Sequence, residues 1–159
     1  MRGMRWAGIL LAVAACQRSP DRVGEAGFAG VQSRGHVVMG VNQYTSRHVF
    51  QPLADGGRIE LQRNGPDSAG TAQIRRHMAV IARQFAEGDF HLPGFVHARE
   101  VPGTAVMAAR QSAITYIVDS LPRGAALRMR SADAAVVAAI HAFLAFQRQD
   151  HHAGAYRDS

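Results

Sequence analysis

The sequence has a single cysteine, no lysine, and no hydrophobic run long enough to cross a bilayer. With Cys16 as its one thiol, the 159-residue chain cannot form an internal disulfide. All 18 basic residues are arginines, and they are interleaved with 12 acids rather than gathered into the basic stripe that binds nucleic acid. We therefore expect the net charge of +6 to lie on a solvated surface, and we do not expect a nucleic acid partner.

The N-terminus combines two arginines, a short apolar run and the cysteine. The run from Trp6 to Ala15 has ten residues, against the about 20 that a membrane-spanning helix needs. It fits the apolar region of an export signal. The residues Val13-Ala14-Ala15-Cys16 resemble the lipobox of bacterial lipoproteins, in which small residues precede a cysteine that is lipidated and becomes the mature N-terminus. An ordinary signal peptide with an Ala-x-Ala cleavage site and an incidental cysteine is the alternative.

The lipobox resemblance implies where the protein works. Residues 1–15 would be removed as a signal peptide, and lipidated Cys16 would anchor the chain to a bacterial membrane, facing the periplasm. Gln17, in place of an aspartate, favours the outer membrane in a Gram-negative cell. The membrane and a protein of the cell envelope are then the expected partners. Residues 16–35 mix Gly, Ser, Pro and charge and predict a flexible tether, and residues 36–159 predict one α+β domain.

A long amphipathic helix is the clearest element of that domain. Four apolar residues recur at intervals of four, three and four, which places them on one helical face: Ile74, Met78, Ile81 and Phe85. Asp67 or Ser68 can cap its first turn, and Gly88 follows its last periodic residue. A loop rich in histidine and aromatic residues is expected to follow, up to His97.

Two β-hairpins complete the pattern. Residues 44–53 and 58–63 are strand-like around a turn at residues 55–57, and residues 113–119 and 125–130 form a second such pair. A second helix opens at Ser131 or Asp133. We therefore expect an α+β fold, a two-layer sandwich with a four-stranded antiparallel sheet and two long helices on one face, in the order ββαββα. The strand order stays open.

From Val38 to His151 the chain resembles a family of small, uncharacterised bacterial domains. The likeness is carried by MGVNQYTSRHVF from Met39, GGRIEL from Gly56, QIRRHM from Gln73, GDF from Gly88, FVH from Phe95, VPGTAVM from Val101 and IHAFLAFQRQDH from Ile140. Members are sometimes labelled aspartate carbamoyltransferase. The carbamoyl-phosphate site of that enzyme uses a Ser-Thr-Arg-Thr run, whereas this chain has Thr45-Ser46-Arg47-His48, so the resemblance implies a fold and not that activity.

The sequence has eight histidines, and these are its best candidates for metal ligands. His77 and His141 lie at the edges of the two apolar helix faces, and helices on one sheet face would bring them together. His48 in the first hairpin and His97 in the loop could join them. Thioether ligands are available from Met39, Met78 and Met107. Because imidazole with thioether suits copper, and imidazole alone suits zinc or copper, we predict a copper or zinc site at His48, His77, His97 and His141.

Two other hypotheses stay open beside the metal site. A histidine at the margin of a helix face also commonly hydrogen-bonds a backbone carbonyl or a carboxylate, and no fixed metal-binding spacing is present. The second hypothesis is a non-catalytic interaction or structural lipoprotein, with an exposed apolar patch on the open sheet face. An enzyme is not expected, because the chain has no G-x-S-x-G nucleophile elbow and no other catalytic motif.

Overall fold

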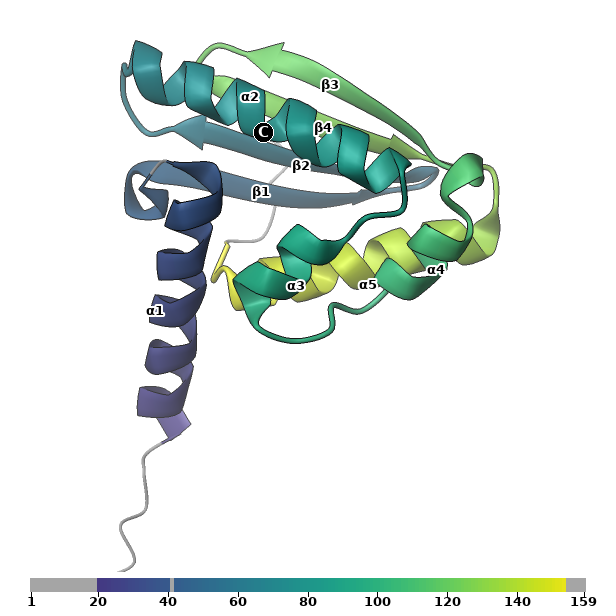
Figure 1. Ribbon diagram of the computed structural model, residues 1–159, viewed down its shortest axis with the longest axis horizontal. Helices are drawn as coiled ribbons and strands as arrows, with labels where there is room; N and C mark the ends of the chain where they lie inside the picture. Colours follow the sequence, from purple (N-terminus) through teal and green to yellow (C-terminus); the bar gives the residue numbers. More distant parts are fainter. Residues whose placement is uncertain (1–19, 41, 154–159) are drawn as a thin grey trace, which may run out of the picture.

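The computed structural model describes residues 20–40 and 42–153, so the predicted signal peptide and Cys16 lie outside the described residues. Figure 1 shows the elements in place. In chain order they are α1 (Pro20–Met39), η1 (Gln43–Thr45), β1 (Ser46–Leu53), β2 (Gly56–Arg63), α2 (Ser68–Ala86), α3 (His91–His97), α4 (Thr104–Ala109), η2 (Gln111–Ala113), β3 (Thr115–Leu121), β4 (Gly124–Arg130) and α5 (Ala134–Asp150). No helix in this part of the chain has both the length and the apolar character needed to cross a membrane.

The four strands form one antiparallel sheet in the order β1-β2-β4-β3. The two strands of each hairpin pair with each other, β1 with β2 and β3 with β4. The two hairpins are joined by the pairing of β2 with β4. Ile59 of β2, for example, lies opposite both Phe50 of β1 and Leu127 of β4. The strand order that the sequence left open therefore places the second strand of each hairpin at the centre of the sheet.

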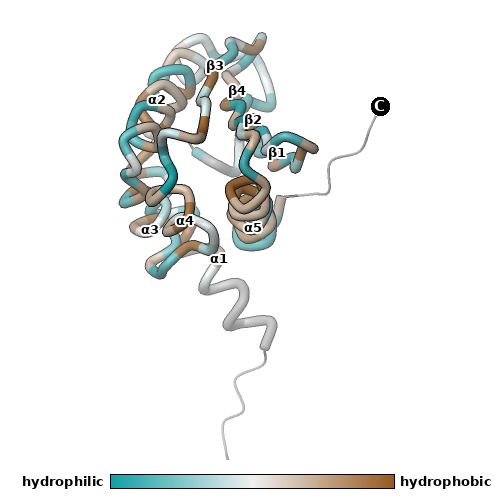
Figure 2. Tube along the Cα trace, turned by 90° about the vertical axis from the view of Figure 1, so that its right-hand side faces the viewer, coloured by the Kyte–Doolittle hydropathy of each residue, from teal (hydrophilic) through white to brown (hydrophobic). Residues whose placement is uncertain are grey.

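Helices α2 and α5 cover the same face of this sheet. Side chains alternate along a strand, and Gly57, Ile59 and Leu61 of β2 are the buried, helix-facing set. Helix α5 lies against β1 and β2, whereas α2 lies mainly against β3 and β4. Figure 2 views this arrangement from the side, with α2 and α5 within the curve of the sheet. The predicted α+β fold, a four-stranded antiparallel sheet with helices packed on it, is confirmed, and α1 adds a third long helix to the two that were expected.

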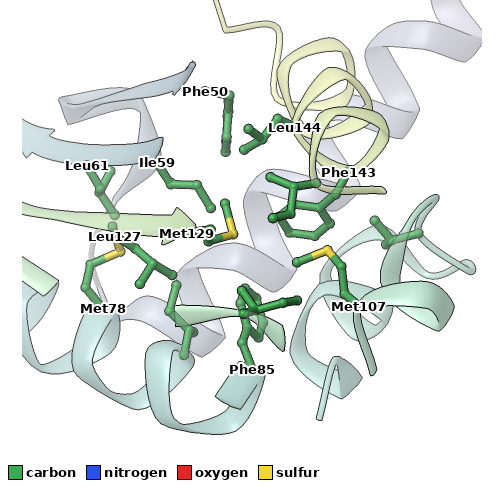
Figure 3. Close-up of a cluster of buried hydrophobic side chains, with 14 of the residues drawn as sticks. Phe50, Ile59, Leu61, Met78, Phe85, Met107, Leu127, Met129, Phe143 and Leu144 are labelled. Atoms are coloured by element: carbon green, nitrogen blue, oxygen red, sulfur yellow. The ribbon is translucent and has the colours of Figure 1, made fainter. Parts of the chain in front are cut away.

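Helix α2 supplies its predicted face to the core. The Asp67 side chain accepts a hydrogen bond from the Gly70 amide at 2.9 Å, which caps the helix as expected. Past the last turn, Gly88 has a φ of 76°, a value that favours glycine. Figure 3 shows how the side chains of both helices and the strands meet. The largest fully buried members of this core are Phe85, Phe143, Leu61, Ile74, Met78, Met107, Leu127, Met129, Ile140, Leu144 and Val136.

Two stretches expected to be irregular are helical instead. Residues 20–35 were expected to belong to a flexible tether, but they form most of α1. Val31, Gly35 and Met39 follow one another at intervals of four and are all buried, and the Arg34 Nε donates a hydrogen bond to the Val96 carbonyl at 2.7 Å. These tertiary contacts outweigh the low helix propensity of the glycines, which costs about 1 kcal/mol each. The expected loop at residues 91–97 forms the short helix α3.

Gly57 lets α5 approach β2, which yields a stability prediction. A Cβ at this position would lie 2.2 Å from Leu144 Cδ1 and 3.1 Å from Ile140 Cγ2, and both side chains are fully buried. We expect Gly57→Ala to lower the free energy of unfolding by roughly 1–3 kcal/mol through overpacking, measured by urea denaturation. Gly65→Ala is the control, because a Cβ there meets nothing within 4 Å. Equal stabilities of the two variants would contradict this close approach.

Candidate functional site

A cavity of about 90 Å³ lies between the sheet and four helices, at the β1 and β2 side. Its wall is mostly apolar, and it also contains four imidazoles, two thioethers and one amide. No carboxylate, arginine or other formally charged side chain belongs to the described wall. The polar and sulfur-containing wall residues are His48, His77, His97, His151, Gln147, Met39 and Met78.

The structure brings three of the four predicted ligands to this wall. His48 comes from β1, His77 from α2 and His97 from the end of α3. His141 does not join them. Its Nε2 donates a hydrogen bond to the Leu53 carbonyl at 2.9 Å and so ties α5 to the end of β1. His141 thus lies away from the cavity wall and bonds a backbone carbonyl, so the structure does not bring it together with the other three predicted ligands.

His97 is held by hydrogen bonds at both ring nitrogens. Its Nδ1 donates to Asp150 Oδ2 at 2.5 Å, and its Nε2 is hydrogen-bonded to the Gln147 side-chain amide at 2.9 Å. Arg99 Nη2 donates to the other Asp150 oxygen at 2.5 Å, and its guanidinium lies 4.6 Å from the centre of the Phe146 ring. This network fastens α3 to the last turn of α5. Both nitrogens of His97 are thus already in use, although its ring is part of the wall.

His151 takes the place that the sequence hypothesis gave to His141. Its ring centre lies 5.0 Å from that of His48 and 5.1 Å from that of His97. His151 was not among the four histidines predicted from the sequence as ligands. The spacing of apolar residues could have identified His151. Ile140, Leu144, Gln147 and His151 are spaced by four, three and four, which places His151 on the face of α5 that leads into the cavity.

The other imidazoles of the wall are kept neutral by their surroundings. Burial lowers the pKa of His48 to about 4, with a smaller contribution from nearby His77. Burial alone lowers the pKa of His77 to about 4. The pKa of His151 falls to about 2 through burial first, and then through repulsion from His48 and His97. All three rings are therefore uncharged at pH 7.

The described residues contain no ready-made cluster of three His, Cys, Asp or Glu side chains that could hold a metal ion. The rings of His48 and His151 lie stacked with their planes 29° apart. For both rings to bind the same metal ion, at least one of the two side chains would therefore have to rotate. Methionine is not one of these four residue types, and the thioethers of Met39 and Met78 belong to the same cavity wall.

On β2, the opposite face of the sheet is polar, whereas an interaction protein was expected to expose an apolar patch there. By alternation along β2, the residues facing away from the helices are polar or charged, and Arg58 and Glu60 form an ion pair there at 2.9 Å. Arg128, in register with Arg58, is hydrogen-bonded to Asp55. Ile117, 41% exposed, is the large exposed hydrophobic residue described on this face. The cavity is therefore the better candidate site.

The neutral imidazoles predict acid sensitivity. The folded protein holds His48 and His77 unprotonated down to a pH of about 4, whereas in the unfolded chain they take up protons near pH 6.5. Their contribution to stability is thus complete above pH 6.5 and is lost as the pH falls from 6.5 toward 4. We expect the free energy of unfolding in urea to drop by more than about 1 kcal/mol between pH 7.5 and 4.5.

His48→Asn should make this decline shallower, because one of the titrating rings is gone. Most of the carboxylate contribution is lost below this pH range, because arginine and amide partners lower the pKa values of Asp55, Asp67 and Asp133. A stability that stays constant from pH 7.5 to 4.5 would show that the imidazoles are not buried in the neutral form.

Comparison of the chain with models of protein families, with curated proteins and with solved structures finds no match. The lipobox and the resemblance to a small bacterial domain family therefore stay predictions.

Proposed function

We propose that this protein is a lipid-anchored domain of the bacterial envelope that binds one transition-metal ion, copper or zinc, at the imidazole-lined cavity. The ligands are His48 and His151, with His77 beside them on the wall. The observation that carries the proposal is that three imidazoles, from β1, from α2 and from the C-cap of α5, line one cavity whose wall has no formally charged side chain. Relative to the sequence hypothesis, His151 replaces His141, and His97 becomes a residue that positions the end of α5.

Ring spacing supports the choice of His48 and His151. Two imidazoles that bind one ion through nitrogens about 2.0 Å from it hold their ring centres roughly 5–6 Å apart. The ring centres of His48 and His151 are 5.0 Å apart. Binding therefore requires a rotation of side chains and leaves the backbone of β1 and α5 where it is.

The chemical state of the rings also supports a ligand role. Among the described residues, no side-chain hydrogen bond reaches the ring of His48 or His77, in contrast to His97 and His141. Both side chains are half-buried, so their ring nitrogens can be reached by a ligand without breaking a side-chain hydrogen bond. Because a metal binds the unprotonated imidazole, rings that are neutral at pH 7 lose nothing to proton competition.

Three further residues support the proposed ligands without binding the metal themselves: His97, Gln147 and Asp150. The hydrogen bonds from His97 to Gln147 and Asp150 fix the last turn of α5, immediately before His151. Arg99 anchors Asp150 from the far side. Partners of this kind, which do not touch the metal but hold its ligands in place, commonly change metal affinity by about 10- to 100-fold.

Metal retention tests the proposal. Full-length chain carrying Cys16→Ser, so that the thiol cannot bind metal, is purified without a histidine tag and dialysed against buffered copper or zinc. We expect one equivalent of metal per protein by mass spectrometry for this background. His48→Asn and His151→Asn should each lower the affinity at least about tenfold, because each removes a ligand nitrogen.

His141→Asn is the matched control, since it removes a histidine of the same helix that bonds the Leu53 carbonyl. We expect it to keep its metal, although it loses a structural hydrogen bond worth about 1 kcal/mol of stability. Circular dichroism checks that each variant is folded. No retained metal, or equal loss in His141→Asn, would remove the proposed site.

The lipid anchor is tested separately. If Cys16 is lipidated, the wild-type protein expressed in a Gram-negative host should sediment with membranes and incorporate labelled fatty acid. Cys16→Ser should abolish the label and release the protein into the soluble fraction, because no acyl chain can be attached. Equal membrane association of both forms, without label, would contradict the lipoprotein assignment but would not affect the metal site.

A further inference from the structure

We infer that the ion is monovalent copper and that a methionine thioether completes its coordination, beside His48 and His151. This inference rests on the proposed function and names the ion and the third ligand of that same site. It comes from two independent features of the cavity wall, namely its two thioethers and its lack of any charged side chain.

Two methionines reach the cavity from different helices. Met78 of α2, 1% exposed, follows His77 directly in the chain, and Met39 ends α1 with 5% exposure. Both belong to the wall that holds His48 and His151. A thioether is a soft ligand that suits Cu(I), whereas Cu(II) prefers imidazole and oxygen donors and zinc takes its sulfur ligands from cysteine thiolates. Thioethers among the imidazoles thus favour the softer ion.

The charge of the wall points the same way. An ion bound here would meet neutral ligands, because the wall contains no carboxylate. Asp150, next to His151, is already engaged by His97 and Arg99. The cost of placing an ion in a low-dielectric interior rises with the square of its charge, so it is about four times larger for Zn²⁺ or Cu²⁺ than for Cu⁺. An uncharged apolar wall therefore discriminates against the divalent ions.

The number of available ligands also favours Cu(I) over zinc. Three or more His, Cys, Asp or Glu ligands are usual for a structural zinc ion, which prefers four, and the described residues offer no such cluster. Two imidazoles and one thioether make a three-coordinate set that Cu(I) accepts. The set draws on β1, the end of α5 and either α2 or α1, so the ion would join the elements that surround the cavity.

Selective loss of Cu(I) binding tests the thioether. In the Cys16→Ser background, Cu(I) affinity is measured anaerobically by competition with bicinchoninate, and Zn(II) and Cu(II) affinities are measured by competition with chelators. The double variant Met39→Leu/Met78→Leu is compared with Met107→Leu/Met129→Leu. The control pair is also fully buried, but neither of its residues belongs to the cavity wall. Leucine keeps the volume of methionine closely enough that both variants should fold.

We expect Cu(I) to bind with at least hundredfold preference over both divalent ions. The cavity double variant should lower the Cu(I) affinity at least tenfold, and the control pair should leave it unchanged. Tight Cu(II) or zinc binding that depends on His48 and His151 but not on the methionines would overturn this inference and leave the proposed function standing. Absence of binding by all three ions would overturn both. Equal loss in the two double variants would show that the methionines act through packing, which also overturns the thioether role.

Discussion

The structure depends on two helices sharing one face of a four-stranded sheet. Helix α5 takes the β1 and β2 half, and α2 takes the β3 and β4 half, so the two apolar helix faces and one sheet face close a single core. Gly57 allows the α5 side chains to settle directly on β2. Beside the first hairpin, α1 and α3 complete the wall, and the cavity lies there. The site is thus a consequence of how the layers meet.

Polar groups at this junction divide into two kinds. His141 and His97 have strong local partners, a backbone carbonyl and a carboxylate with an amide, and they fasten α5 to β1 and α3. His48 and His77 have no such partners among the described residues, and burial keeps them neutral. The first kind determines the architecture, and the second kind supplies ligand atoms.

Much of the fold followed from the sequence because its signals are local. Helical spacing, the Asp67 and Asp133 caps and the two turn regions predicted α2, α5 and both hairpins, and burial of their apolar faces predicted the sandwich. Helix α1 was missed because its glycines argue against a helix, whereas its stability comes from contacts with α3 and the core. Strand order was beyond the sequence, because it depends on which hairpin strands meet in space.

The candidate site was predicted in part. His48, His77 and His97 share the cavity wall. His141 lies eight residues after Asp133, the N-cap of α5, and His151 is the C-cap directly after Asp150, so only the true end of α5 shows which of the two faces the cavity. His97 lies on the cavity wall, but its hydrogen-bond partners Gln147 and Asp150 are distant in sequence and could not be paired with it. Side-chain hydrogen bonds between distant segments decide which imidazoles can still bind a metal ion.

X-ray absorption at the copper edge of the Cu(I)-loaded protein tests the central claim most directly. Two imidazole nitrogens and one sulfur should surround the ion, and the sulfur contribution should vanish in Met39→Leu/Met78→Leu. A first shell of oxygen atoms without imidazole scattering would contradict a site built from His48 and His151.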